Sequence, residues 1–250
     1  MVCRRLTIAL ALLVVMTVAT RAACTLSPIG SATVAAVHDG RTLQLTDGRE
    51  LRLAAVEADP SGRAMLERLA GGQAVRLMRL GPEIDRYGRL YAFATTAGRT
   101  ETLQAELLKA GAARVSARVG DWNCAKTLLE IEKAARAAHR GLWARADFSP
   151  LAATDLPRIR AKIGHFVLVQ GKVLSVHQSG GTIYLNFGRH WTRDFSTVIL
   201  RRNKRLFADV DLEPQRLQGR RIRVRGWVEL RRGPVIEAAW PEQIELADGN

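Results

Sequence analysis

The sequence contains no apolar run long enough to cross a membrane, because a transmembrane helix needs about 20 such residues. Its longest apolar run covers residues 6–19. Arg4 and Arg5 precede this run, and the small residues Ala22 and Ala23 follow it, which is the pattern of a secretory signal peptide. We therefore expect residues 1–23 to be removed on export, leaving a soluble periplasmic or extracellular protein without a membrane span.

Cysteine is scarce, at three residues in 250. Cys3 belongs to the predicted signal peptide, so Cys24 and Cys124 remain as an even pair in an oxidising compartment. We predict a disulfide between them, and two independent buried thiols are the alternative. Acylation of Cys24 would make the protein a lipoprotein, but residues 21–23 lack the aliphatic residue that such a site usually carries.

Acidic residues are too few to balance the basic ones: 24 Asp and Glu stand against 38 Lys and Arg, for a net charge of +14. A surplus of this size favours a polyanionic partner such as nucleic acid, an anionic membrane surface or an acidic polysaccharide. The alternative is an ordinary solvated surface in an arginine-rich proteome. The five histidines are scattered, and no Cys or His spacing indicates a zinc site.

The first half of the chain has the pattern of five short strands. Apolar or alternating segments are separated by turn signals, of which Asp47-Gly48 is a strong hairpin signal. We expect strands at residues 32–37, 42–46, 51–56, 73–78 and 90–95. Five short strands with a few helices predict a small closed barrel of the oligonucleotide-binding (OB) type.

Helical patterns follow these strands. Leu103 and Leu107 share one face of a predicted helix at residues 101–110, which stops at Gly111. Asp121 is the predicted N-cap of a longer helix that reaches about residue 140. The first domain, residues 24–148, is thus expected to be a barrel with helices packed on it.

Strand patterns return after a segment, residues 149–159, that has the composition of a linker. Gly180-Gly181 and Arg232-Gly233 mark turns. We expect further strands at residues 166–173, 182–187, 195–200, 221–230 and 234–239. Residues 160–250 therefore form a second small all-β, barrel-like domain of the OB type, and the predicted fold class of the whole chain is mainly β with α.

Five motifs occur in order across residues 30–145. They are Asp39-Gly40-Arg41-Thr42, Leu51-Arg52-Leu53, Asp85-Arg86-Tyr87-Gly88-Arg89-Leu90, the segment from Leu107 to Val115, and Gly141-Leu142-Trp143. Each motif is weak alone, but their joint order and spacing resemble the thermonuclease family, also called staphylococcal nuclease-like. The segment after residue 160 resembles the barrel-type appendage found on some bacterial relatives.

This resemblance implies a hydrolase that acts on DNA or RNA, because members of the family cut phosphodiester bonds with the help of calcium. The cation offsets phosphate charge and positions water, and a carboxylate orients or deprotonates that water. Two arginines stabilise the extra charge of the transition state. By the resemblance, Arg52 and Arg89 correspond to these two arginines.

The metal-binding half of the motif set is altered in this chain. Arg41 stands where active relatives carry the second acid of Asp-Gly-Asp-Thr, and Ser61 stands where they carry a glutamate. Asp39 and Glu57 remain as candidate Ca²⁺ ligands, with Asp59 in the water-activating role. The sequence therefore predicts a phosphodiester hydrolase with a degraded calcium site; the alternative is a weak or inactive homologue that binds nucleic acid or another polyanion.

The second domain carries dense basic residues with interleaved aromatic ones. Three arginines alternate with apolar residues between positions 221 and 225, so on a strand they line one face with positive charge. Binders of single strands need such a groove, with rings for base stacking. We expect nucleic-acid contacts from Arg41, Tyr87, Arg193, Arg221, Arg223 and Arg225. For the aromatic residues Phe187, Trp191, Phe195 and Trp227 we favour a place in the hydrophobic core, and base stacking is the alternative.

Overall fold

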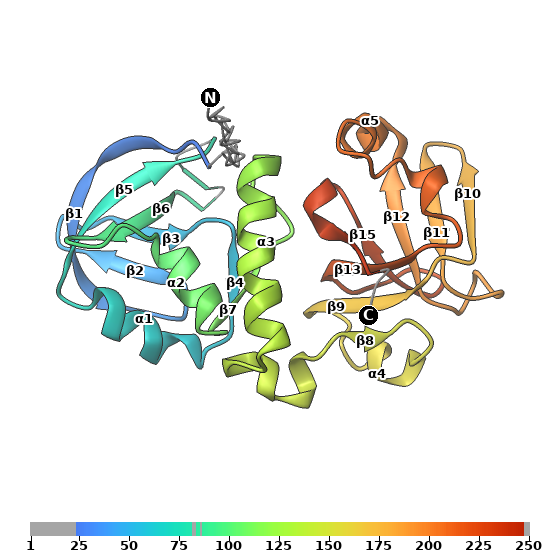
Figure 1. Cartoon of the computed structure of the whole chain (residues 1–250), viewed down its shortest axis with the longest axis horizontal. Helices are drawn as coiled ribbons and strands as arrows, with labels where there is room; N and C mark the ends of the chain where they lie inside the picture. Colours follow the sequence, from blue (N-terminus) through green and yellow to red (C-terminus); the bar gives the residue numbers. More distant parts are fainter. Residues whose placement is uncertain (1–23, 82–83, 86, 248–250) are drawn as a thin grey trace, which may run out of the picture.

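A computed structural model describes residues 24–81, 84–85 and 87–247. The predicted signal peptide, residues 1–23, lies outside the described residues. Figure 1 shows two β-rich halves on either side of the long helix α3 (Trp122–Ala137). Each half has its own hydrophobic core, and Trp122, the first residue of α3, packs against both.

The first half is a closed barrel of five strands in the order β1-β2-β3-β6-β5. Its strands are β1 (Ser27–Val37), β2 (Thr42–Leu45), β3 (Glu50–Leu53), β5 (Ala74–Arg79) and β6 (Leu90–Thr96). All neighbours are antiparallel except β3 and β6, which are parallel. Irregularities in β1 let it bend and pair with both β2 and β5. The predicted OB-type barrel is thus confirmed.

Every second side chain along the short strands points inward and fills this barrel. Leu43 and Leu45 of β2 and Leu51 and Leu53 of β3 are buried, while the residues between them are only partly covered. Burial of each such leucine contributes about 1.5–3 kcal/mol. The predicted strand at residues 51–56 is interrupted after Leu53, because Ala55 has a left-handed backbone (φ 63°) that a strand cannot continue through. The chain resumes as β4 (Val56–Ala58), which pairs with β7 (Ala113–Val115).

Three helices pack on the barrel: α1 (Gly62–Ala70), α2 (Leu103–Lys109) and α3. The two predicted helices are confirmed, and the second starts at the predicted cap, Asp121, while the first starts at a threonine cap that was not predicted. Thr102 accepts a hydrogen bond from the backbone N–H of Ala105, and Asp121 accepts one from Cys124. Helix α1 was missed by the sequence analysis. Within the described ranges, no helix combines the length and the apolar character that crossing a membrane requires.

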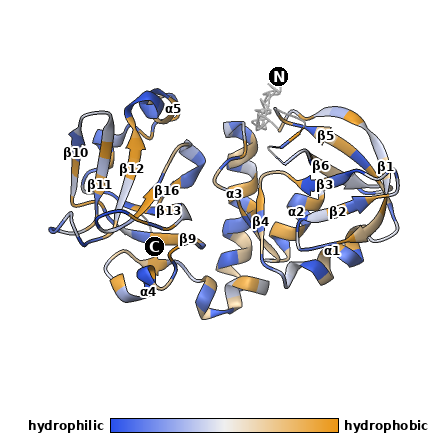
Figure 2. Cartoon of the chain, turned by 180° about the vertical axis from the view of Figure 1, so that it is seen from behind, coloured by the Kyte–Doolittle hydropathy of each residue, from blue (hydrophilic) through white to orange (hydrophobic). Residues whose placement is uncertain are grey.

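The second half contains two sheets, ordered β10-β11-β12-β15-β14 and β16-β13-β9-β8. The strands are β8 (Leu151–Ala152), β9 (Phe166–Lys172), β10 (Ser175–Ser179), β11 (Thr182–Asn186), β12 (Ser196–Leu200), β13 (Arg221–Trp227), β14 (Glu229–Leu230), β15 (Pro234–Glu237) and β16 (Ile244–Leu246). The short helices are α4 (Leu156–Arg160) and α5 (Lys204–Ala208). Turns of 3₁₀ helix complete the chain as η1 (Gly141–Ala144), η2 (Ala146–Phe148), η3 (Arg201–Asn203), η4 (Pro214–Leu217) and η5 (Pro241–Gln243). In Figure 2, β12 is coloured hydrophobic and α5 is largely hydrophilic, as expected for a core strand and a surface helix.

The two halves share one strand order. In each, the third strand pairs in parallel with the fifth: β3 with β6, and β12 with β15. In each, a helix lies between the third and fourth strands, α1 in one and α5 in the other. The first strand of the second half is split into β9 and β10, and its fourth strand into β13 and β14. This half is therefore an OB-like arrangement divided into two sheets rather than a closed barrel.

The segment at residues 149–159 corrects the prediction of a plain linker. It contains β8 and the first part of α4, and β8 pairs in parallel with β9. Leu151 and Ile159 are buried in the second core. Its polar and proline-containing composition resembles a linker, but two well-spaced apolar side chains hold it on the second half.

A buried cluster of charges joins the two halves. Arg225 of β13 is fully buried and donates to both carboxylate oxygens of Glu132 on α3, at 2.8 and 2.9 Å. It also contacts Glu245 of β16. Arg136 of α3 binds the same two glutamates, at 2.8 Å to Glu132 and 3.1 Å to Glu245. Arg223 adds a third cation, 3.3 Å from Glu245.

The arginines of this cluster control the ionisation of Glu245. Burial opposes the charged form, but the positive charges of Arg225, Arg136 and Arg223 outweigh it and lower the pKa of Glu245 from 4.5 to about 2. A carboxylate whose pKa is depressed by folding stabilises the folded state above its ordinary pKa. That stability is lost as the pH falls toward the folded-state pKa.

We expect Glu245→Gln to lower the free energy of unfolding by roughly 3 kcal/mol at neutral pH, since each pKa unit corresponds to about 1.4 kcal/mol. The difference from wild type should shrink between about pH 5 and about pH 2, as Glu245 becomes protonated in the wild-type protein. Urea unfolding followed by circular dichroism across this range measures it. Glu130→Gln, at an exposed position of α3, is the matched control with little expected effect. A pH-independent difference for Glu245→Gln would contradict the assignment.

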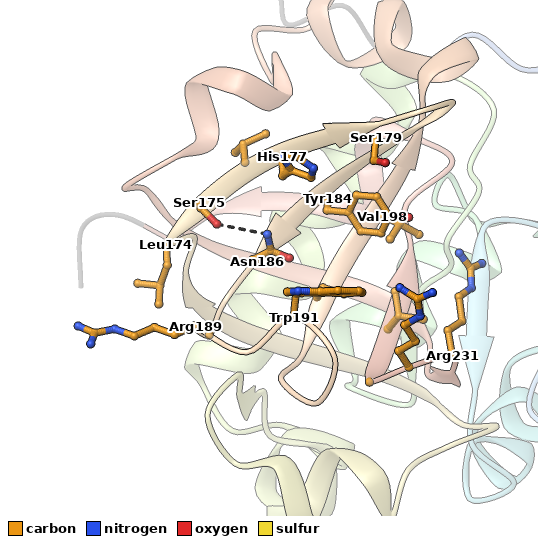
Figure 3. Close-up of a pocket in the computed structure, with 16 residues that line it drawn as sticks. Leu174, Ser175, His177, Ser179, Tyr184, Asn186, Arg189, Trp191, Val198 and Arg231 are labelled. Carbon is orange, nitrogen blue, oxygen red and sulfur yellow. Dashed lines mark hydrogen bonds between the residues drawn. The ribbon is translucent and has the colours of Figure 1, made fainter.

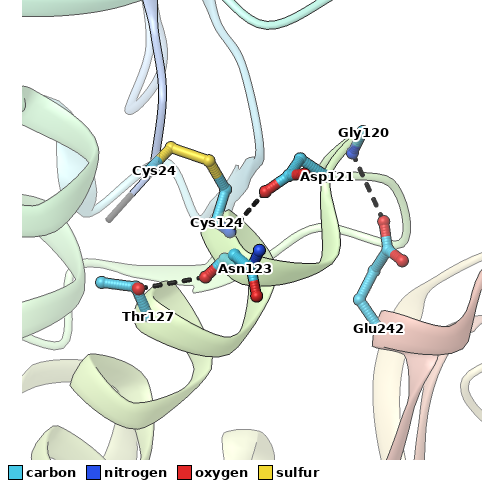
Figure 4. Close-up of a disulfide and its surroundings, with 7 residues drawn as sticks. All are labelled: Cys24, Gly120, Asp121, Asn123, Cys124, Thr127 and Glu242. Atoms are coloured by element: carbon cyan, nitrogen blue, oxygen red, sulfur yellow. Dashed lines mark hydrogen bonds between the residues drawn. A yellow bond between two sulfur atoms is a disulfide. The ribbon is translucent and has the colours of Figure 1, made fainter. Parts of the chain in front are cut away.

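The predicted disulfide is present between Cys24 and Cys124, with the two Cα atoms 4.4 Å apart (Figure 4). It joins the segment just before β1 to the first turn of α3 across 100 residues of sequence. Near it, Glu242 of η5 accepts a hydrogen bond of 2.8 Å from the backbone N–H of Val119, so the second half also holds this end of α3. Structural disulfides are typical of oxidising compartments.

Replacement of both cysteines, Cys24→Ser/Cys124→Ser, should lower the free energy of unfolding by about 2–5 kcal/mol, because the bridge closes a long loop in the unfolded chain. Denaturant unfolding of the mature protein measures this loss, and reduction of the wild type with a thiol should reproduce it. Two free thiols in the non-reduced protein, detected by mass spectrometry, would show that the bridge does not form.

Candidate nucleic-acid interface on the first barrel

The turn between β1 and β2 is ordered by Asp39. Its carboxylate accepts from the backbone N–H of Arg41 at 2.8 Å and from the hydroxyl of Thr42 at 3.0 Å, as aspartate commonly does in turns. Gly40 packs closely against the next segment of the site. A Cβ atom at Gly40 would lie 2.7 Å from the Ala58 Cβ and from the Asp59 carbonyl oxygen. The absence of a side chain at this position therefore brings the turn and β4 together.

Arg41 reaches from this turn to β4. Its Nη1 lies 2.5 Å from Oε1 of Glu57 and donates to the carbonyl oxygen of Val56 at 2.8 Å. Both side chains are mostly buried, with 17% of Arg41 and 16% of Glu57 exposed. Glu57, a predicted metal ligand, is therefore engaged by a guanidinium group.

Arg52 points from β3 toward the same turn. Its Nη1 donates to the Thr42 hydroxyl at 2.9 Å and lies 3.9 Å from Asp39 Oδ2. Burial lowers the pKa of Arg52, and the neighbouring charges of Arg41 and Arg89 lower it further. Neighbouring positive charges thus repel the Arg52 guanidinium, and a bound anion would offset this repulsion.

Arg89 lies at the start of β6 and is held by an acid of its own motif. Asp85 accepts from the side chain of Arg89 at 2.8 Å, and the Glu50 carboxylate lies 3.5 Å from Arg89 Nε. The guanidinium also lies 5.0 Å from the centre of the Tyr87 ring, which is largely exposed. Asp85 was not predicted as a partner of Arg89, although the motif places the two residues four positions apart.

Asp59 belongs to a separate set of contacts. Its carboxylate accepts from the backbone N–H of Ser61 at 3.0 Å and lies 3.9 Å from Arg145. Burial opposes the charged form, but the hydrogen bonds from Ser61 and the charges of Arg145 and Arg114 lower the pKa of Asp59. Neither arginine was singled out from the sequence, because both come from segments far from Asp59 in the chain.

The predicted site residues are thus only partly assembled. Arg41, Arg52 and Arg89 lie close enough for their charges to interact, with Asp39 and Glu57 beside them. Among the residues that the structure describes, no three His, Cys, Asp or Glu side chains gather as a metal site requires.

The arginine row predicted in the second half needs correction. Arg223 and Arg225 do alternate with apolar residues, but their face is covered by α3 instead of solvent. Arg225 is fully buried, and Arg223 is mostly buried between Glu245 and Gln170. Arg225 is thus out of reach of nucleic acid and Arg223 is held by internal partners, while Arg221 and Arg193 are exposed.

The aromatic residues of the second half divide into two groups. Phe187 and Phe195 are buried and pack on each other, with ring centres 5.2 Å apart. Trp191 and Trp227 are 57% and 50% exposed. The core is therefore the right interpretation for the two phenylalanines and the wrong one for the two tryptophans.

The closed barrel and the three helices packed on it define the first half as a domain of the OB type. Residues 60–145 match the family of staphylococcal nuclease homologues. The chain therefore contains a staphylococcal nuclease homologue domain. No match was found among curated proteins.

The matched range sets which site residues the family comparison covers. It begins one position after Asp59 and includes Arg89, Arg114 and all three helices. The turn that carries Asp39 and Arg41, strand β3 with Arg52, and Glu57 lie before it. The family match thus supports the class of the domain and does not extend to the altered positions Arg41 and Glu57.

Proposed function

We propose that the first barrel binds nucleic acid through its phosphodiester backbone, without calcium-dependent hydrolysis. The observation that carries this proposal is the contact of Arg41 with Glu57, which replaces a metal–carboxylate contact by an internal ion pair. The neighbouring Arg52 meets a carboxylate oxygen of Asp39 only at 3.9 Å, and two other arginines repel it. A phosphate group would satisfy its free N–H donors and offset this repulsion.

The donor set at the turn does not fit Ca²⁺. Calcium takes six to eight oxygen ligands, several of them carboxylate oxygens. Here one oxygen of Asp39 accepts from Arg41 N–H and the other from Thr42, and Glu57 pairs with Arg41. A cation placed between Asp39 and Glu57 would also meet the positive charge of Arg41, at a cost on the order of 1 kcal/mol or more.

Asp59 is also poorly suited to activate water. A general base works best when its pKa lies near the working pH, whereas hydrogen bonds and nearby arginines lower the pKa of Asp59. Its carboxylate is directed to Ser61 and Arg145 rather than to Arg52 or Arg89. Both contacts favour a binding role for the barrel over a hydrolytic one.

We further propose that the protein works outside the cytoplasm, in the periplasm or the extracellular medium. The Cys24–Cys124 bridge supports this location, because disulfides persist in oxidising compartments. The strongly basic composition, with a net charge of +14, suits a polyanionic partner there.

Incubation of the mature protein with heat-denatured DNA, in calcium and in EDTA, tests the proposed function. We expect no calcium-dependent cutting and a binding affinity that falls steeply with salt, because bound phosphates release counterions. Arg52→Ala/Arg89→Ala should weaken binding by about tenfold or more and reduce the salt slope. Fluorescence anisotropy and gel analysis of the DNA provide the two measurements.

The matched control is Arg68→Ala/Arg76→Ala, which removes the same charge from exposed positions on α1 and β5. It should change binding far less than the Arg52/Arg89 variant. Calcium-dependent cutting that disappears in Arg52→Ala/Arg89→Ala would contradict the proposal and identify the barrel as a nuclease.

Arg41→Asp should create calcium affinity, because it releases Glu57 and adds a carboxylate beside Asp39. We expect calcium binding to tighten at least about tenfold over wild type, which corresponds to about 1.4 kcal/mol. Isothermal titration of the mature protein with CaCl₂ measures it.

Arg41→Ala is the control for this substitution, since it removes the cation without adding a ligand. It should bind calcium more weakly than Arg41→Asp. Equal calcium affinity in the wild type and Arg41→Asp would contradict the interpretation that Arg41 prevents metal binding.

A further inference from the structure

The second half carries an open groove of about 1210 Å³ on the outer face of its larger sheet (Figure 3). The groove lies over β10, β11, β12 and β15 and is bordered by two loops, residues 188–195 and 231–233. It is larger than the range of about 300–1,000 Å³ that is usual for enclosed small-molecule sites. Its size and openness therefore suit a segment of polymer.

The floor of the groove follows from strand alternation. Ile183 and Leu185 of β11 point into the core, so Tyr184 and Asn186 point outward. Cross-strand pairing sets Tyr184 between His177 and Val198 in one row across the sheet. The floor is thus a row of ring and apolar side chains beside a second row of small polar ones.

An ordered loop presents Trp191 above this floor. Asp194 accepts from the backbone N–H of His190 at 2.8 Å, and its own N–H donates to the His190 carbonyl at 2.8 Å. These bonds close the turn that carries Trp191, whose side chain remains 57% exposed. A large exposed indole on a hydrogen-bonded loop costs little conformational entropy when it binds a ligand.

Positive charge surrounds the aromatic side chains. Three arginines line the groove, and no carboxylate is among its sixteen lining residues. Arg231 is paired with Glu229 and Glu237. In the described part of the chain, Arg189 and Arg232 pair with no carboxylate, and the Arg232 guanidinium lies 4.9 Å from the centre of the Trp191 ring. The groove therefore favours a ligand with negative charge and flat, stackable groups.

We propose that this groove binds single-stranded nucleic acid, with bases stacked on Trp191 and Tyr184 and phosphates bound by Arg189 and Arg232. Trp191 is exposed and Tyr184 partly so, and such rings beside cations suit single strands, because bases outside a duplex offer their faces for stacking. A duplex hides those faces. A sulfated or carboxylated polysaccharide satisfies the arginines but lacks the bases.

This second site is separate from the arginines of the first barrel, and it does not depend on whether that barrel binds or cuts. The two are tested independently in the Arg52→Ala/Arg89→Ala background, in which binding at the first barrel is weakened. If Trp191→Ala lowers the affinity in this background, the loss measures binding at the groove alone.

Fluorescence anisotropy of a labelled oligothymidylate with the mature protein is the direct test. In the Arg52→Ala/Arg89→Ala background, Trp191→Ala should weaken binding about tenfold through lost stacking. Arg189→Ala/Arg232→Ala should weaken it as well and reduce the slope of log affinity against log salt by about 1.4, the value for two phosphates of a single strand.

Two matched controls remove the same groups outside the groove. Trp227→Ala deletes the other exposed tryptophan of this half, which packs edge-on against Phe166. Arg202→Ala/Arg205→Ala removes two exposed arginines near α5. Both control variants should leave the affinity within about twofold of the parent, since neither Trp227 nor these two arginines line the groove.

A spectroscopic readout separates stacking from charge attraction. The oligonucleotide should quench tryptophan emission in the parent protein, and Trp191→Phe should remove most of that quenching while retaining binding by its own ring. Unchanged affinity in Trp191→Ala, or equally effective competition by dextran sulfate at matched charge, would overturn the proposal and identify the groove as a general polyanion surface.

Discussion

Glu132, Arg225 and Glu245 lie together in the interior between the two halves, and the arrangement of the whole chain depends on their contact. Ions withdrawn from water are costly, and each of these three is tolerated only because the others satisfy it. Glu132 belongs to helix α3, whereas the other two belong to adjacent strands of the second half. Their pairing therefore fixes α3 against the second sheet. The disulfide at the other end of α3 ties the same helix to β1.

The buried ion cluster and the disulfide hold together two halves that have the same strand order but different surfaces. The first presents arginines that are drawn into ion pairs with Glu57, Asp85 and Glu50. The second presents an outer sheet face with an exposed tryptophan, Trp191, and with Arg189 and Arg232, which pair with no acid among the described residues. Fold alone does not decide what such a unit binds, because binding resides in the side chains placed on it. The turn with Asp39 and Arg41 and the groove with Trp191 therefore present different side chains, although the two halves share one topology.

Local sequence patterns predicted the parts of the candidate site but not their partners. The strand that carries Arg52 and the motif that carries Arg89 follow from alternation and turn chemistry within a few residues. Asp85 binds Arg89 within one motif, whereas Glu50, which also contacts Arg89, lies on β3, a strand that only the barrel brings beside β6. Arg145 meets Asp59 for the same reason. The engagement of Glu57 by Arg41 required the close approach of Gly40 to β4, which no spacing in the sequence reveals.

The sequence by itself determined the five strands of the first barrel, the two capped helices and the cysteine pair, because these depend on periodicity, on local hydrogen bonding and on which cysteines remain. It also placed Arg223 and Arg225 correctly on the face opposite Ile222 and Val224. Only the tertiary structure decided what covers that face. Glu132, 93 positions before Arg225, reaches it from α3 and turns a predicted nucleic-acid surface into a buried ion cluster. Alternation sets the direction of a side chain, whereas its surroundings come from segments that folding brings from far along the chain.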